Sequence, residues 1–322
     1  MRTLTLTIVF LAFNLALSAK VIRVNPTPNS GAQYSTLQAA HDATSTLNGD
    51  TLYLEGSTYG AGGLSLSKKL TIIGNGYFLG ENPQTQFNLS PSNINGGVYC
   101  YTGSEGSSFT GCSFTTGVYI YTNNLNFSRN HFYTGNYGIY PQANCSDIVI
   151  HSNYFNGSYA IYFPYNHSNI LAVNNFFAGY VSTSSNFSGI FANNIFAYPA
   201  TIYNSTLVNN IALHSMSMTN CLYTYNIGNS TQFGNQNGNQ QNVAQTSLFV
   251  GASGNSTDGQ WKLKTGSPAI GAGEGGTDIG IYGGEMPYTL SGMPPIPAIY
   301  SLDSQSLPTN TLNVTIKAKS HN

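Results

Sequence analysis

The sequence predicts an all-β fold, in which a single chain winds into the stacked coils of a single-stranded parallel β-helix. Three observations support this prediction: a short phrase that recurs from Ser108 to Gly228, residue columns that keep register with it, and Gly, Asn and Ser turns between its copies. A repeat this short cannot bury an apolar face alone, so neighbouring copies must stack into one core.

The recurring phrase reads apolar–x–apolar–x–x–Asn–x–apolar, and its cleanest copies are Leu125–Phe132 and Ile148–Phe155. Alternation of apolar residues in steps of two indicates short strands rather than helices. Aligned on the asparagine, with Cys112 in the same slot one copy earlier, the copies lie 16 to 23 residues apart, at Asn130, Asn153, Asn175, Asn194, Asn210 and Asn226. We expect these amides to form a hydrogen-bonded ladder at a turn; the alternative is ordinary surface turns.

Two further columns follow the same register. The first is a run of phenylalanines that we expect to point inward: Phe114, Phe132, Phe155, Phe177 and Phe196. The second is an Ile-Tyr pair whose tyrosine lies seven or eight residues later, at Ile120-Tyr121, Ile139-Tyr140, Ile161-Tyr162 and Ile202-Tyr203. Side chains alternate along a strand, so each tyrosine should face outward where its isoleucine faces inward.

The composition excludes several classes of protein. Only 7% of the 322 residues are charged, and the net charge of −1 gives no reason to expect nucleic acid as a partner. The four cysteines, Cys100, Cys112, Cys145 and Cys221, show no metal-binding spacing. A buried thiol is the favoured interpretation of Cys112, and a disulfide with Cys100 stays open outside the cytosol.

The first residues are typical of a secretory signal peptide, which we place at residues 1–19. Arg2 supplies the positive start, Leu4–Leu17 the apolar centre and Ala16–Ala19 a small-residue cleavage site. No later stretch is long and apolar enough to span a membrane. We therefore expect a protein that is secreted or held at the cell surface.

The next elements form the start of the solenoid, which we place at residues 20–285. We expect strands at Val21–Val24, Thr51–Leu54, Leu64–Leu66 and Leu70–Gly74. Between the first two, Tyr34–Leu47 is predicted to be a helix with Ser35 as N-cap and Leu37, Ala40 and Leu47 on one face. Such a helix would cover the open end of the solenoid and its unpaired strand edges.

These opening segments resemble those of the pectin-lyase-like superfamily of right-handed parallel β-helix proteins. The resemblance rests on Tyr34–Ala40, Gly49–Leu54 and Leu70–Gly76, and near the end on Trp261–Leu263, Gly266–Gly273 and Asp278–Tyr282. It implies right-handed winding, a capping helix in the first segment and a closing coil in the last, as in secreted bacterial members. It implies little about activity, because one fold hosts lyases, hydrolases and inert scaffolds.

The end of the chain has a different composition. We interpret Gln232–Gln245, rich in Asn, Gln and Gly, as a long turn or lateral loop. Residues 286–322 are predicted to be an extended tail that contains Met293–Pro297 and a strand at Leu312–Lys319. This tail should pack back along the helix or close its C-terminal end.

Ionisable residues are too few to suggest an evident catalytic site. Between Gly106 and Thr257 the chain has one acid, Asp147, and one cation, Arg129, with Glu105 just before. The two acids could share a face two coils apart, about 10 Å by coil spacing, while Arg129 lies near the other strand end. That separation is at the outer limit for an inverting glycoside hydrolase. The histidines at positions 131, 151, 167 and 214 fall in different columns, so we expect surface or groove-lining histidines, no metal site and no cofactor.

The outward tyrosines are the better candidates for a binding site. Tyr121, Tyr140 and Tyr162 should repeat at coil spacing, where their rings could stack against sugars. The favoured interpretation is that stacked tyrosines only stabilise the sheet, with sugar binding as the alternative. The sequence thus predicts a non-catalytic scaffold whose partners are polysaccharide or other cell-surface components; the alternative is a polysaccharide lyase or glycoside hydrolase that uses Asp147 and Glu105.

Overall fold

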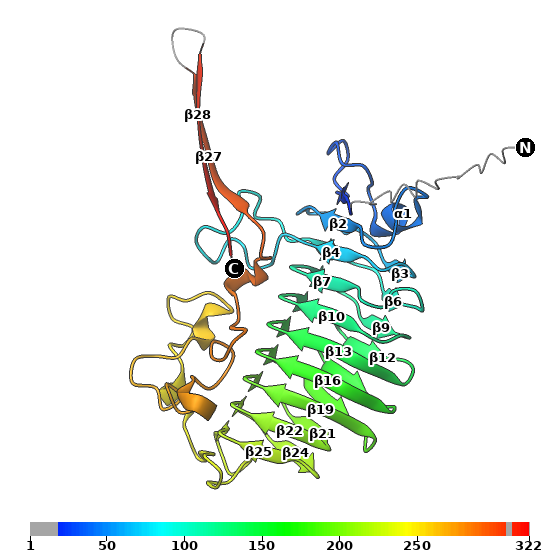
Figure 1. Cartoon of the computed structure of the whole chain (residues 1–322). Coiled ribbons are helices and arrows are strands. Elements are labelled where there is room, and N and C mark those ends of the chain that lie inside the picture. The colour runs from blue at the N-terminus through cyan, green and yellow to red at the C-terminus, as the bar shows by residue number, and fades with distance from the viewer. Residues whose placement is uncertain (1–18, 307–310, 322) are drawn as a thin grey trace, which may run out of the picture.

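The computed structural model describes residues 19–306 and 311–321, and these form a right-handed parallel β-helix of about nine turns (Figure 1). Most turns contribute one strand to each of three parallel sheets, which we name A, B and C. Sheet A has ten strands, and sheets B and C have eight each. The fold class predicted from the sequence is confirmed.

The strands of each sheet follow one another along the rod in chain order. Sheet A contains β1 (Val21–Val24), β2 (Thr51–Leu54), β4 (Thr71–Ile73), β7 (Ser108–Thr110), β10 (Leu125–Ser128), β13 (Cys145–His151), β16 (His167–Val173), β19 (Phe187–Ala192), β22 (Ser205–Val208) and β25 (Leu222–Thr224). Sheet B contains β3 (Leu64–Leu66), β6 (Val98–Cys100), β9 (Val118–Ile120), β12 (Tyr137–Pro141), β15 (Tyr159–Phe163), β18 (Tyr180–Thr183), β21 (Ala200–Tyr203) and β24 (Met216–Thr219). Sheet C contains β5 (Asn93–Ile94), β8 (Ser113–Phe114), β11 (His131–Phe132), β14 (Tyr154–Phe155), β17 (Phe176–Phe177), β20 (Ile195–Phe196), β23 (Ile211–Ala212) and β26 (Ile227–Gly228).

The phenylalanine column lies inside the coils, as predicted. The rings of Phe114 and Phe132 stack with centroids 4.7 Å apart, and those of Phe132 and Phe155 with centroids 4.5 Å apart. All five members of the column are buried. A second stack that the sequence analysis missed joins Phe109 and Phe127 in sheet A at 5.4 Å. Both stacks follow from parallel register, which places equivalent side chains one coil apart.

The asparagine column forms the predicted ladder at the corner between sheets A and C. The side-chain oxygen of Asn153 accepts hydrogen bonds from the backbone N–H of Asn130 at 2.9 Å and from its side-chain amide at 3.1 Å. Its own amide nitrogen donates to the carbonyl oxygen of Phe127 at 2.8 Å. The same bonds recur on each coil and end at a seventh asparagine, Asn239, which the sequence analysis did not include. All six predicted members are fully buried, so the alternative of surface turns is wrong.

The residue before each ladder asparagine makes the turn by a left-handed backbone conformation. The φ angles at this position lie between 53° and 57° in Arg129, Ser152, Asn174, Asn193, Asn209 and Tyr225. Asparagine tolerates this conformation better than most residues, which explains its frequency there. The corner therefore repeats a two-residue device, a left-handed residue followed by a ladder asparagine.

The predicted helix near the N-terminus is present but shorter than expected. Helix α1 covers Leu37–Asp42, and its N-cap is Thr36, whose hydroxyl accepts the N–H of Ala39. Leu37 and Ala40 are buried in the main core, as expected. The prediction was wrong for Ser35 as N-cap and for Leu47, which is exposed, because the helix ends before it reaches that residue.

A loop closes the C-terminal end of the solenoid. We name Asn229–Val243 the closing loop; its Phe233 is buried in the main core, with its ring 6.1 Å from that of Tyr223. Backbone N–H of Tyr225 donates to the carbonyl oxygen of Asn237 at 3.0 Å, so the loop also satisfies part of the last coil. The stretch predicted as a lateral loop thus covers the end of the core.

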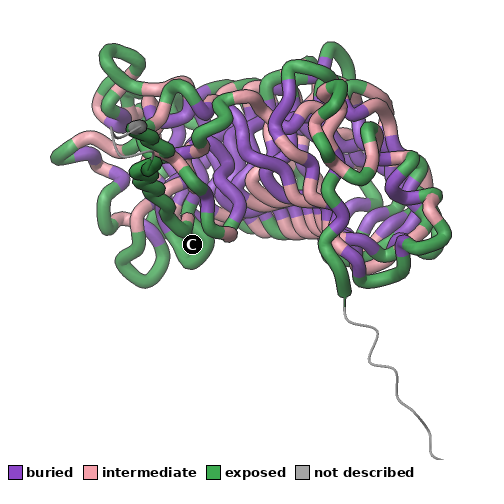
Figure 2. The backbone as a smooth tube through the Cα atoms, turned by 90° about the horizontal axis from the view of Figure 1, so that it is seen from above, coloured by how far each residue is buried: buried purple, intermediate pink, exposed green. Residues whose placement is uncertain are grey.

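Residues 244–297, named here the C-terminal segment, run back beside the coils. The segment contains α2 (Gln245–Leu248) and three short 3₁₀ helices, η1 (Gly259–Trp261), η2 (Glu274–Gly276) and η3 (Leu290–Gly292). It buries the outer face of sheet C in a second apolar core that joins Phe176, Ile195 and Ile211 to Ile279 and Ile281. Figure 2 shows buried residues in purple through the middle of the coils and exposed residues in green mainly in the loops.

The last described residues form a hairpin that stands clear of the coils (Figure 1). It pairs β27 (Ala298–Ser306) with β28 (Leu312–Lys319) in antiparallel register. The strand predicted at Leu312–Lys319 is therefore confirmed, but it pairs with β27 and does not lie along the helix.

The four cysteines are free thiols. Cys100 lies in sheet B, whereas Cys112 takes the first ladder position beside Phe114 and has a pKa raised to about 12 by burial. The buried-thiol interpretation of Cys112 is confirmed and the disulfide is not formed. The predicted signal peptide falls almost entirely on residues 1–18, which lie outside the described residues.

Candidate functional site

Nine tyrosines lie along the outer face of sheet B, from its second strand to its sixth. We name this surface the tyrosine face: Tyr99, Tyr101, Tyr119, Tyr121, Tyr137, Tyr140, Tyr159, Tyr162 and Tyr180. All are half-buried or exposed, while Ile120, Ile139 and Ile161 between them are fully buried. The predicted alternation of inward isoleucine and outward tyrosine is confirmed.

Parallel register divides the tyrosines into columns. Tyr99, Tyr119 and Tyr140 are direct partners on successive coils, and the pairing of Ile139 with Ile161 places Tyr162 next in the same column. The predicted column therefore holds Tyr140 and Tyr162 but not Tyr121. Tyr121 instead stacks on Tyr101, with ring centroids 5.1 Å apart.

The misplacement of Tyr121 has a simple geometric reason. Counting from the phenylalanine column assumes that every connection from sheet C to sheet B has the same length. Val118 pairs with Ile139, yet it follows Phe114 by four residues while Ile139 follows Phe132 by seven. The longer connection in the second of these coils shifts the tyrosine register.

The rings of the tyrosine face are arranged differently in its two halves. Near the N-terminal end, Tyr99 and Tyr119 are almost parallel, at 14° and 5.0 Å, so that each covers a face of the other. Further along, Tyr140 is tilted by 59° to Tyr162 and by 47° to Tyr137, while Tyr137 and Tyr162 stack on each other at 21°. A ring that is tilted to all its neighbours, as Tyr140 is, leaves its faces partly uncovered, so this half can offer aromatic surface to a ligand.

A shallow groove of about 360 Å³ borders the tyrosine face at the corner between sheets B and A. We name it the amide corner. The pairing of Cys145, His167 and Phe187 places the preceding asparagines on successive coils, and these are exposed: Asn144, Asn166 and Asn186. Ser146, Ser168 and Ser188 line the same groove. Sequence reasoning missed this column because its residues repeat outside the phrase that carries the ladder.

The two candidate acids lie at this corner, two coils apart. Asp147 has a left-handed backbone, with φ of 59°, and Asn124 and Asn169 hold the same conformation on the coils either side. Backbone N–H of Gly106 bonds to the carbonyl of Asn124 at 2.6 Å, which places Glu105 beside this column. By coil spacing the acids are about 10 Å apart, as the sequence indicated.

Each acid is engaged by its own neighbours. Hydrogen bonds from Ser146 and Asn169 lower the pKa of the Asp147 carboxyl, and a hydrogen bond from Thr122 lowers the pKa of Glu105. Both groups therefore stay ionised near neutral pH and neither is suited to donate a proton.

The candidate cation lies elsewhere. Arg129 follows β10 at the corner between sheets A and C, at the other end of the strand from the acids. Its guanidinium donates to the carbonyl oxygens of Met293 at 2.9 Å and His321 at 2.7 Å. Burial lowers its pKa from a very high starting value, so it stays charged and holds the end of the chain.

The histidines match the prediction of surface or groove-lining positions only in part, with His214 at the surface and His167 lining the amide corner. Only His214 is exposed; His131 and His151 are half-buried and His167 is fully buried. Desolvation lowers the pKa of His131, His151 and His167 to about 4, so these rings are neutral near pH 7. His167 is buried because its strand position points inward, where its ring contacts Phe163 with centroids 4.9 Å apart.

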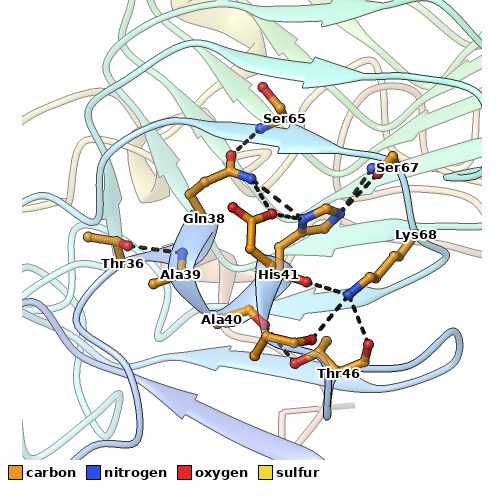
Figure 3. A network of polar contacts seen from close by, with 11 residues as sticks. Thr36, Gln38, Ala39, Ala40, His41, Thr46, Ser65, Ser67 and Lys68 are labelled. Atoms are coloured by element: carbon orange, nitrogen blue, oxygen red, sulfur yellow. Dashed lines mark hydrogen bonds and ion pairs between the residues drawn. The ribbon is translucent and has the colours of Figure 1, made fainter.

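A serine, a histidine and an acid meet beside helix α1 (Figure 3). The Nδ1 atom of His41 lies 2.8 Å from the carboxylate of Asp42, and its Nε2 atom lies 3.5 Å from the hydroxyl of Ser67. However, Nε2 already accepts the backbone N–H of Ser67 at 3.1 Å. The lone pair that a general base would use is occupied, so the group ties α1 to the chain that follows β3.

A buried acid that sequence reasoning missed joins distant parts of the chain. The carboxylate of Asp258 accepts hydrogen bonds from the Asn82 side chain at 2.9 Å and from backbone N–H of Ser291 at 2.6 Å. The hydroxyl of Tyr288 lies 3.4 Å from this carboxylate and 2.7 Å from the hydroxyl of Tyr77. This cluster holds the C-terminal segment to the loop between β4 and β5. A single acid in a polar stretch gives no signal of such a contact.

Two further properties concern the described part of the chain only. Within residues 19–306 and 311–321, no three His, Cys, Asp or Glu side chains gather closely enough to hold a metal ion. In the same residues, no helix is long and apolar enough to cross a membrane.

Comparison of the chain with protein-family models, with curated proteins and with solved structures gives no match. The tyrosine face and the amide corner are therefore interpreted from their own geometry.

Proposed function

We propose that this protein is a secreted, non-catalytic scaffold of the pectin-lyase-like type that binds a neutral polysaccharide along the tyrosine face and the amide corner. The observation that carries the proposal is the adjacency of tilted, half-exposed tyrosine rings to a column of exposed amides on the same rigid coils. Sugars present C–H faces to aromatic rings and hydroxyls to amides, so the two surfaces suit the two sides of one ligand.

Rigidity strengthens this proposal. The tyrosines and asparagines sit on or beside strands whose backbones are fixed by pairing with both neighbouring coils. A site on such a frame loses little conformational entropy when a ligand binds. Equivalent groups recur on two successive coils, Tyr140 with Asn144 and Tyr162 with Asn166, so a repeating polymer could make the same contact twice.

Cleavage of the polysaccharide is less well supported by the same residues. An inverting hydrolase needs one carboxylic acid with a raised pKa, whereas the pKa values of Asp147 and Glu105 are both lowered. A lyase needs a basic group near the acids, and Arg129 is bound to carbonyl oxygens at the opposite corner. The left-handed turn that Asp147 shares with Asn124 and Asn169 explains its presence without catalysis.

The proposal is tested with a glycan array on the purified chain that begins at Lys20. At least one neutral glycan should be retained, and Tyr140→Ala and Tyr162→Ala should each weaken retention about tenfold. Tyr198→Ala is the matched control, since Tyr198 is an exposed tyrosine outside the tyrosine face. An array with no retained neutral glycan, or an equal loss in the control, contradicts the proposal.

The catalytic alternative has its own test. Incubation with any retained glycan should give no shorter products, and Asp147→Asn should leave retention within about twofold of the wild type. Product formation that Asp147→Asn abolishes would replace the binding role with a cleaving one. Secretion is checked separately, by the N-terminal residue of the protein recovered outside its host cells, which we expect to be Lys20 or a neighbour.

A further inference from the structure

Four tyrosines of the tyrosine face form a closed cluster of rings. Tyr137 and Tyr140 come from β12, and Tyr159 and Tyr162 come from the next strand of sheet B, β15. The ring centroid of Tyr137 lies 4.6 Å from that of Tyr140, 5.1 Å from that of Tyr159 and 5.3 Å from that of Tyr162. Tyr162 also lies 5.1 Å from Tyr140 and 5.4 Å from Tyr159. We name these four residues the tyrosine cluster.

An irregularity in each of the two strands places both of its tyrosines on the outer face. Residues three apart on a regular strand point to opposite faces. Here the two residues between the tyrosines are both buried, Gly138 and Ile139 in β12 and Ala160 and Ile161 in β15. The pairing of β15 with β18 shifts register between Tyr159 and Ile161. A β-carbon on Gly138 would lie 2.5 Å from the carbonyl oxygen of Ala160, so only glycine fits there. The backbone therefore brings all four rings to one face.

The rings of the tyrosine cluster contact only other tyrosine rings within residues 19–306 and 311–321. The one tryptophan of the chain, Trp261, contacts Phe176 of sheet C instead. All four cluster tyrosines are half-buried, so an oxidant at the surface can reach them. Tyrosine is one of the few side chains that a one-electron oxidant converts to a radical. In the cluster, each such radical would lie in contact with at least two further tyrosines.

We propose that the tyrosine cluster is a site of oxidative coupling, at which hydrogen peroxide and a peroxidase form a dityrosine bond between two of its rings. Each of the two tyrosines loses its phenolic proton and one electron, and the two radicals join by a carbon–carbon bond between positions ortho to their hydroxyls. The ring hydrogens at those positions are then lost while the oxygens regain protons, so both phenols are restored. One hydrogen peroxide takes up the two electrons and two protons and becomes two waters.

The ring geometry favours coupling inside the tyrosine cluster. The new bond lies in the plane of both rings and brings their centres slightly closer than the 4.6 Å that separates Tyr137 and Tyr140. Tilted rings, such as those of Tyr140 and Tyr162 at 59°, turn an edge toward each other. Tyr99 and Tyr119 are almost parallel, so their rings must separate before such a bond can form. Rings that the fold holds in contact also react ahead of rings on different molecules.

A dityrosine bond would supply a covalent link that the four cysteines, all free thiols, do not. Three of the five ring contacts in the cluster join β12 to β15, on neighbouring coils. A bond at one of these contacts closes a loop of the chain and stabilises the fold as a disulfide does, by restricting the unfolded chain. The proposal is independent of glycan binding and takes from the proposed secretion only the oxidant.

The test treats the purified chain that begins at Lys20 with a haem peroxidase and hydrogen peroxide over a range of protein dilutions. Monomeric protein should lose the mass of two hydrogens and gain dityrosine fluorescence, with a yield that dilution does not change. Protease digestion and mass spectrometry should place the bond within the tyrosine cluster. The combined variant Tyr137→Phe, Tyr140→Phe, Tyr159→Phe and Tyr162→Phe keeps the rings but not the phenols, and should lower the yield about tenfold.

The matched control combines Tyr59→Phe, Tyr133→Phe and Tyr198→Phe. These tyrosines are 53%, 61% and 48% exposed, more than any member of the cluster, and in the described part of the chain no other tyrosine ring contacts them. Their loss should change the yield less than about twofold. Absence of dityrosine from monomers, a bond mapped outside the cluster, or an equal loss in the control overturns the proposal. Mapping uses the wild type, so it decides the matter even if a variant misfolds.

Discussion

The two ends of the solenoid solve the same problem with different residues. Each end must cover an apolar core and the unpaired edge of the last coil. At the N-terminal end, α1 buries Leu37 and Ala40, and the amine of Lys68 donates to the carbonyl oxygens of His41 at 2.6 Å and Thr46 at 2.9 Å (Figure 3). At the C-terminal end, the closing loop has no charged residue or histidine and uses Phe233 and Asn239.

This difference shows two ways of ending a repeat. The N-terminal end adds a new element, a helix whose apolar side faces the core and whose carbonyls need a cation. The C-terminal end continues the pattern without strands, because Asn239 accepts hydrogen bonds from Asn226 as the next ladder residue would. The first solution adds ionisable groups, while the second uses only amides and one aromatic ring.

The largest expected loss of stability comes from the asparagine ladder, and it should be greater in the middle of the ladder than at its end. Asn175→Ala removes the acceptor for backbone N–H of Asn153 and the donor to Ile150, both buried, and should cost about 4 kcal/mol. Asn239→Ala should cost about half as much, since water can reach the last coil. Urea denaturation of both variants measures the ratio. Equal costs would mean that Asn239 is shielded from water as well as the asparagines in the middle of the ladder, and would contradict the comparison.

A smaller effect is expected from the apolar residue that covers each end. Phe233→Ala and Leu37→Ala should each lower the free energy of unfolding by about 3 kcal/mol through loss of burial and a residual cavity. Hydrogen exchange should locate the damage in the last coils for Phe233→Ala and in the first coils for Leu37→Ala. Leu47→Ala is the matched control, because Leu47 is exposed. Damage spread evenly along the rod in both variants would contradict independent ends.

The smallest effect is a response to acid at one end only. Hydrogen bonds from His41 and Gln38 lower the pKa of Asp42 below its usual value of 3.8. A carboxyl whose pKa is lower in the folded state stabilises the fold above the unfolded pKa, and this contribution disappears as the pH falls through the folded pKa. Hydrogen exchange near α1 should therefore speed up as the pH falls below 3.8, after correction for intrinsic rates. Exchange in the closing loop should not change, and an equal response there would contradict the comparison.

The sequence predicted those parts of the fold that repeat. The asparagine ladder and the phenylalanine stack were found because one residue type recurs at one position of each repeat. That position has the same surroundings on every coil, so the same side chain does the same work there. The alternation that turns Ile139 inward and Tyr140 outward was found for the same reason. Features that occur once were missed, such as Asp258 and the contact of the C-terminal segment with sheet C. These contacts form because two segments far apart in the sequence lie close together in the fold, and composition does not reveal that proximity.

The candidate site was predicted in part. Tyr140 and Tyr162 do share a column, and Asp147 and Glu105 do share a corner, because strand alternation and coil spacing are regular. Tyr121 was misplaced because the connections between sheets vary in length. The amide corner was missed since Asn144, Asn166 and Asn186 are ordered by pairing between strands and not by a phrase in the chain.

The ladder carries a consequence for how such a chain can change over generations. Each asparagine of the ladder makes the same hydrogen bonds to the asparagines on the coils above and below. The bonds themselves therefore set no limit on the number of coils. Duplication or loss of one whole coil would leave both closures intact, but it would move the C-terminal segment relative to the loop between β4 and β5, to which Asp258 ties it. A gain or loss of coils therefore requires a matching change in the length of residues 244–297, which run the other way beside them.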